Sequence, residues 1–92
     1  MKVVVMTRKE TLAVDSATSV SARIVETEEG KTLMLDIYTD RDKIRVYFPH
    51  PGKTFQTDLP RIMRQIQQQV IEGDGSVVID LTSYRELRML VE

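Results

Sequence analysis

Polar and apolar residues alternate through the central part of the chain, between residues 20 and 48. An alternation of period two is typical of strands with one buried face. The buried positions fall into three groups, which are Val20, Ala22 and Ile24, then Leu33, Leu35 and Ile37, then Ile44, Val46 and Phe48. The first link contains Gly30, where a tight hairpin needs a positive φ, and the second is the polar turn Asp40–Lys43. The pattern therefore predicts an antiparallel meander with one apolar face.

The segment before the meander contains a short continuous apolar run within Lys2–Arg8. Such a run predicts a strand buried on both faces. Leu12–Val14 is its expected hairpin partner. Asp15–Ser19 is rich in residues whose side chains compete for backbone hydrogen bonds, and it is expected to form a loop.

The clearest helical pattern follows the meander. Apolar residues recur at helical spacing at Leu59, Ile62, Met63, Ile66 and Val70. Asp58 is the expected N-cap, Pro60 suits a first helical turn, and Gly73 suits the C-terminal end. Residues 49–57 are expected to be a loop. The sequence predicts a long amphipathic helix whose apolar stripe covers the apolar face of the meander.

The C-terminal segment contains a predicted strand, Ser76–Asp80, and a short final element. Ser83 and Glu86 have the spacing of a capping box, which favours a short helix. The apolar residues within Leu87–Val91 suit a strand equally well at this length. The expected fold is a single α+β domain over residues 1–92, with an antiparallel sheet, one long helix packed on it and a short C-terminal element.

The amino-acid composition excludes several classes of function but does not identify a single function. The net charge is -1, so no chain-wide positive charge favours a polyanion. There is no cysteine, which excludes disulfides and thiolate chemistry and fits a reducing compartment. The longest apolar run is Val3–Met6, too short to span a membrane or to form a signal-peptide core. We therefore expect a cytoplasmic protein that makes no membrane contact.

No motif predicts a catalytic residue, a cofactor site or a metal site. Two Gly-Lys-Thr triplets, at residues 30–32 and 52–54, lack the earlier glycine of a phosphate-binding loop and are interpreted as turns. Asp36, Asp40 and Asp42 are interleaved with cations that would repel a metal ion. The only imidazole, His50, has no recognisable nucleophile near it and is interpreted as an exposed loop residue. A non-enzymatic function is expected.

The second face of the predicted meander is mixed rather than simply charged. Its candidate interaction residues are Arg23, Val25, Met34, Tyr38, Arg45 and Tyr47. Three interpretations remain open: a terminal segment covers this face, it binds a protein or a second copy of the chain, or it binds a single nucleic-acid strand. Asp36 on the same face would oppose a polyanion. We therefore expect a small binding protein that acts through protein contacts, as a homodimer or with another protein; the alternative is a single-stranded nucleic-acid-binding protein.

The outward face of the predicted helix is rich in amides and arginines. Its members are Arg61, Arg64, Gln65, Gln67, Gln68, Gln69 and Glu72. Such a face could lie along phosphates, but a solvated helix surface has the same composition. We interpret it as solvated.

Overall fold

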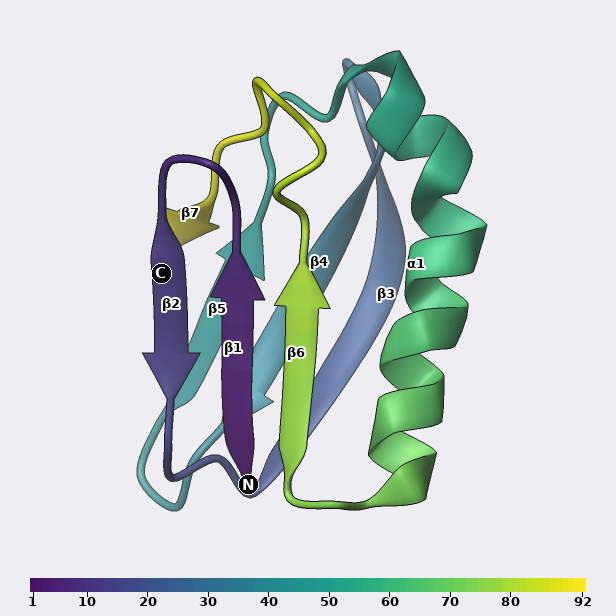
Figure 1. Cartoon of the computed structure of the whole chain (residues 1–92). Coiled ribbons are helices and arrows are strands. Elements are labelled where there is room, and N and C mark those ends of the chain that lie inside the picture. Colours follow the sequence, from purple (N-terminus) through teal and green to yellow (C-terminus); the bar gives the residue numbers. More distant parts are fainter.

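The computed structural model describes all 92 residues and contains two β-sheets and one helix (Figure 1). The three-stranded sheet has the order β2 (Thr11–Val14), β1 (Lys2–Met6), β6 (Ser76–Asp80). The four-stranded sheet has the order β3 (Ser19–Thr27), β4 (Gly30–Tyr38), β5 (Lys43–Tyr47), β7 (Leu90–Val91). The helix α1 comprises Gly52–Glu72. These elements confirm the predicted α+β fold with its meander, long helix and short C-terminal element.

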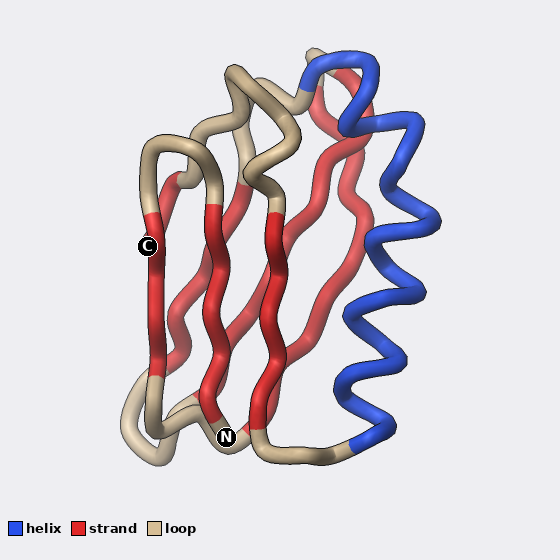
Figure 2. The backbone as a smooth tube through the Cα atoms, in the orientation of Figure 1, coloured by secondary structure: helices blue, strands red, loops and turns tan.

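The two sheets lie face to face, and α1 runs along one side of the pair beside β6 and β3 (Figures 1 and 2). The core lies between them. The four-stranded sheet contributes Leu33, Leu35, Ile37, Val46 and Phe48, and α1 contributes Phe55, Leu59, Ile62 and Ile66. The helix therefore shares the inner face of the meander with the three-stranded sheet.

The meander has the predicted apolar face, except that Ile24, which was expected to be buried, is 40% exposed. Leu35, for example, lies opposite both Ala22 and Val46. Gly30 has a φ of 110°. A Cβ at that position would overlap with Gln56 Oε1, which accepts a hydrogen bond from the Lys31 N–H. A side chain at residue 30 would therefore displace the contact that ties this hairpin to α1.

The N-terminal hairpin also forms as predicted, but β1 is not buried on both faces. Val3 and Val5 are fully buried, whereas Val4 and Met6 are half-buried. The three-stranded sheet has a core on one side only, because the second sheet and the helix both pack against the same face. β1 pairs antiparallel with β2 and parallel with β6.

The predicted helix start at Asp58 is wrong, as is the predicted loop over residues 49–57. The helix begins at Gly52, with Pro51 as its N-cap residue. The physical reason is Phe55, which is 1% exposed and packs edge-on against Phe48, with ring centroids 5.5 Å apart. Phe55 extends the buried stripe by one turn, since it stands four residues before Leu59. The end of the helix was predicted correctly, because Gly73 adopts the left-handed conformation there.

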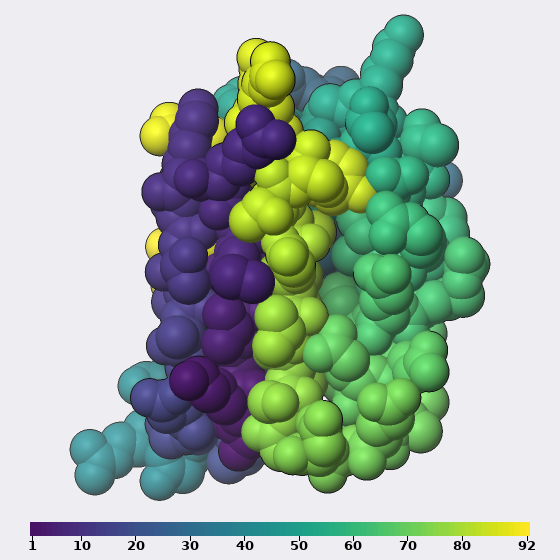
Figure 3. Space-filling view, in the orientation of Figure 1, coloured from purple at the N-terminus to yellow at the C-terminus, as the bar shows by residue number.

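The predicted C-terminal helix is also wrong, and the alternative strand is correct. Residues 81–89 cross from β6 to β7 as turns over residues 82–86 followed by an irregular stretch, and only Leu90–Val91 is regular. Leu81 and Leu87 are buried, and Tyr84 packs on Phe55 with ring centroids 5.2 Å apart. These side chains anchor the segment at three-residue intervals against the core, and this tertiary contact overrides the capping-box signal. Figure 3 shows the segment lying between the N-terminal strands and the start of α1.

The one helix of the structure, α1, is not both long and apolar enough to cross a membrane.

Candidate protein interface on the four-stranded sheet

The six predicted interaction residues all lie on one surface, the outer face of the four-stranded sheet. The outer face consists of the side chains that alternate with the core residues on β3, β4 and β5. The three-stranded sheet and α1 both lie on the other side (Figure 1), so no second layer covers it. Arg23 and Tyr38 are exposed, and the remaining four residues, Val25, Met34, Arg45 and Tyr47, are half-buried. The possibility that a terminal segment covers this face is therefore wrong.

An apolar row crosses this outer face. Met34 lies between Arg23 on β3 and Tyr47 on β5, and Tyr47 lies opposite Leu90 on β7. Arg23 Nη2 lies 3.3 Å from the sulfur of Met34, so the arginine lies along the row. Leu90 is 44% exposed. Sequence reasoning missed Leu90 because the segment containing it was expected to form a helix.

A charged row lies next to the apolar one. Asp36 lies opposite Arg45, and two hydrogen bonds join the side chains, from Nε to Oδ1 at 2.8 Å and from Nη2 to Oδ2 at 3.3 Å. The Arg45 hydrogen bond holds the pKa of Asp36 below its usual value, against the opposing effect of burial. The same bond raises the pKa of Arg45. Backbone hydrogen bonds between Arg45 and Glu92 extend the row to the edge of the sheet.

The two tyrosines of this face are separated by the charged row. Tyr38 pairs with Lys43, whereas Tyr47 pairs with Met34, so three pairs along the strands separate the rings. Four residues of a strand span about 14 Å. The Asp36–Arg45 pair lies between them. The face therefore offers two isolated rings rather than a continuous stacking platform.

The residues considered as catalytic, phosphate-binding or metal-binding groups lie apart from this face, except Asp36. His50 Nδ1 lies 2.6 Å from Glu29 Oε2, at the exposed rim of a wide groove of about 880 Å³ near the start of α1. Gly52-Lys53-Thr54 forms the first turn of α1 and is not a turn between elements as predicted, whereas Gly30 lies in a hairpin. No group of three potential metal-ligating side chains gathers anywhere in the structure. Asp36 instead binds Arg45, away from the Asp40–Asp42 turn.

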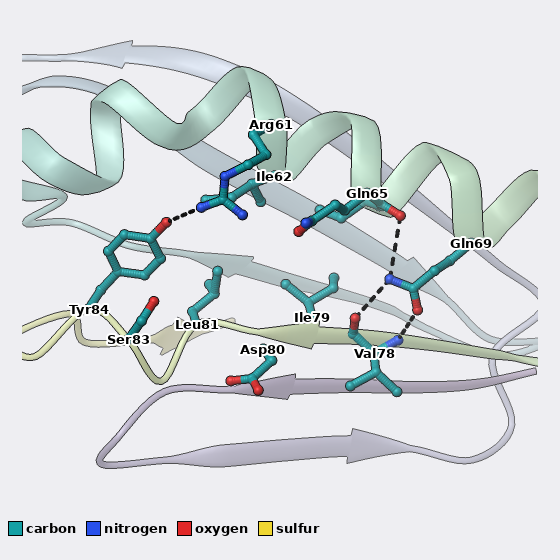
Figure 4. A pocket seen from close by; sticks show the side chains of 11 residues that line it. Arg61, Ile62, Gln65, Gln69, Val78, Ile79, Asp80, Leu81, Ser83 and Tyr84 are labelled. Atoms are coloured by element: carbon teal, nitrogen blue, oxygen red, sulfur yellow. Dashed lines mark hydrogen bonds between the residues drawn. The ribbon is translucent and has the colours of Figure 1, made fainter.

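A small cavity of about 60 Å³ lies between α1 and β6 (Figure 4). Its size admits a few water molecules. At one end, Tyr84 Oη donates to Asp58 Oδ2 at 2.6 Å and accepts from Arg61 Nη2 at 3.1 Å. Burial and the Asp58 hydrogen bond raise the pKa of Tyr84. These three polar side chains are hydrogen-bonded to one another. We therefore interpret the cavity as a seam, meaning a narrow packing gap between α1 and β6.

At the other end of this seam, Gln69 holds the edge of β6 (Figure 4). Its Oε1 accepts from the Val78 N–H at 2.7 Å, and its Nε2 donates to the Val78 carbonyl at 2.9 Å. The amide thus pairs with the strand as a neighbouring strand would. This helix face was predicted to be solvated. Gln67 and Gln68 are indeed exposed, but Gln69 is half-buried because its amide bonds to β6.

Comparisons of the chain with protein-family models, with curated proteins and with solved structures found no match.

Proposed function

We propose that this chain is a small non-enzymatic binding protein that acts through protein contacts, as a homodimer joined by the outer face of the four-stranded sheet. The observation that carries the proposal is the apolar row of Met34, Tyr47 and Leu90, partly exposed on a sheet face that no other element covers. Contiguous apolar residues on an uncovered face, rimmed by polar ones, are typical of protein interaction sites.

The composition of this face fits a protein interface. Tyrosine, methionine and arginine are the residue types enriched at the buried centres of such surfaces. The charges at its centre, Asp36 and Arg45, neutralise each other within the chain. Burying a pair that is already hydrogen-bonded costs less than burying either charge alone.

The size of the face suggests a dimer of moderate affinity. Four strands span about 19 Å across the sheet, and the nine residues of β4 span about 30 Å. The shorter strands β5 and β7 reduce the covered area further. The resulting footprint is smaller than the ~800 Å² per partner of a standard interface. We therefore expect association in the micromolar range.

Binding of a single nucleic-acid strand has less support on the same face. Two of the three guanidinium nitrogens of Arg45, Nε and Nη2, already bind Asp36, and the carboxylate neutralises the charge that would attract a phosphate. The two tyrosines of this face are too far apart to stack on consecutive bases, and Asp36 lies between them. The absence of cysteine agrees with a cytoplasmic location, which we include in the proposal.

Sedimentation equilibrium from low to high micromolar concentration tests the proposal. The wild-type mass should rise from 10.6 kDa toward twice that value. Tyr47→Ala should weaken association by about tenfold or more, as expected for a central aromatic contact. Val78→Ala is the matched control, because Val78 is 43% exposed on the outer face of the other sheet and should leave the dimer unchanged.

Two results would contradict the proposal. One is a mass that stays at 10.6 kDa throughout the concentration range. The other is tight binding of an unstructured fluorescent oligonucleotide that weakens steeply with salt, which would favour the nucleic-acid function instead.

A further inference from the structure

The distribution of charge on the outer face defines how a second copy would be oriented on it. Among its outward-facing residues, β4 carries one charged side chain, the acid Asp36, and β5 carries only the bases Lys43 and Arg45. The outer strands repeat this contrast, since β3 carries the base Arg23 and the chain beyond β7 ends in the acid Glu92. Acidic and basic strands thus alternate across the sheet.

Two stacked sheets with aligned strands, related by a two-fold axis, can be arranged in two ways. If the axis runs across the strands, every strand faces its own copy. Asp36 then has no base opposite it on β4 of the partner, and Arg45 faces only bases or neutral residues of the partner's β5. If the axis runs along the strands, between β4 and β5, then β4 faces β5 of the partner and β3 faces β7.

This inference rests on the proposed dimer. We propose that the two-fold axis of the dimer runs along the strands, so that Asp36 of each copy lies opposite the partner's Arg45. The four groups then form a closed ring of alternating charge at the centre of the interface. Like-charge contacts, which the other arrangement creates, destabilise a wrong orientation and so add specificity.

The apolar row supports the same orientation. With the axis between β4 and β5, Met34 lies opposite the partner's Tyr47, and this contact occurs twice. Contacts between a thioether and an aromatic ring are favourable. Arg23 lies opposite the partner's Leu90, next to the partner's Glu92. Both rows therefore become complementary in one arrangement.

A double charge reversal tests the axis. Asp36→Lys combined with Arg45→Glu keeps an ion pair within the chain and, with the axis along the strands, restores both contacts in its own dimer. We expect this double variant to associate with itself within about threefold of the wild-type affinity. Its affinity for the wild-type chain should be at least tenfold weaker, because each ring contact in the mixed dimer then joins like charges. Mixed samples with one fluorescently labelled chain, followed by sedimentation velocity, measure both affinities.

The opposite pattern would overturn the proposed axis. A mixed dimer that is tighter than either homodimer indicates an axis across the strands, because each charge then faces its own position on the partner and only the mixed pair joins opposite charges. Indiscriminate pairing shows that these charges do not face the partner and also refutes the proposal. A wild-type chain that is monomeric throughout removes the proposed function itself, so the two failures are distinguishable. Circular dichroism and the urea midpoint verify folding of the double variant.

Crosslinking provides a second test that leaves the ion pair intact. The chain has no cysteine, so single cysteines can be placed without interference. Stacked sheets lie about 10 Å apart, within reach of a short bismaleimide. Arg23→Cys mixed with Leu90→Cys should yield a crosslinked heterodimer in at least threefold excess over either homodimer. Predominant crosslinking of Arg23→Cys to its own copy would refute the axis along the strands.

Discussion

The amide of Gln69 provides the most direct test of how α1 holds the edge of β6. Gln69→Ala removes both hydrogen bonds to Val78, at 2.7 and 2.9 Å. Each such bond contributes about 0.5–1.5 kcal/mol, which sums to about 1–3 kcal/mol. Water can reach the freed backbone groups because Val78 is partly exposed, and alanine is a slightly better helix former. We therefore expect a loss of about 1–2 kcal/mol in the free energy of unfolding.

Urea denaturation at one fixed protein concentration measures this loss. Small domains lose about 1–3 kcal/mol of stability per molar urea, so the midpoint should fall by roughly half a molar to one molar. Gln68→Ala is the matched control, because Gln68 is exposed on the same helix and bonds only to Glu72, at 3.3 Å. Hydrogen exchange adds a local readout, since the Val78 amide should lose protection in Gln69→Ala alone. Equal midpoints for the two variants, with Val78 still protected, would refute the proposed role of Gln69.

Two further outcomes follow from the core and from the ion pair. Ile66 is 3% exposed, so Ile66→Ala should lower the free energy of unfolding by about 2–5 kcal/mol through the cavity it leaves; a midpoint equal to that of Gln68→Ala would contradict the helix phase. Arg45 lowers the pKa of Asp36 in the folded protein. The stability contributed by this pair is therefore fully present above about pH 4, the pKa in the unfolded chain, and is lost as the pH falls through the lower pKa of the folded state. The free energy of unfolding of Asp36→Asn should therefore depend less on pH than that of the wild type in this acidic range; parallel curves would show that the pair contributes nothing.

Local patterns predicted the elements whose determinants are local. The alternation through residues 20–48 predicts which side chains of the meander face the core, because a pleated strand has no freedom to change that order. Gly30 was predicted at its turn because a tight hairpin needs a positive φ, which is also a local requirement. The outer face followed directly from the register, which is why all six candidate residues lie together.

The remaining features depend on contacts between distant segments. Pro60 resembled a residue of the first helical turn, and only the burial of Phe55 against Phe48 shows that the helix begins earlier. The spacing of Leu81, Tyr84 and Leu87 suits a helix and a series of turns equally well. Leu90 joined the candidate face only through its pairing with Tyr47, for which the sequence carries no local signal.

The parallel pairing of β1 with β6 has a consequence for the order of folding. The three strands of the meander can pair with one another once Tyr47 has been synthesised, and only the short β7 is added later, whereas β1, made earlier, must wait for Ser76–Asp80. Until then β1 has only its hairpin with β2, and an isolated two-stranded hairpin is marginally stable in water. Val3 and Val5 consequently lack their neighbours Val77 and Ile79 through most of synthesis. Closure of the three-stranded sheet, which joins opposite ends of the chain, is therefore the expected slow step of folding.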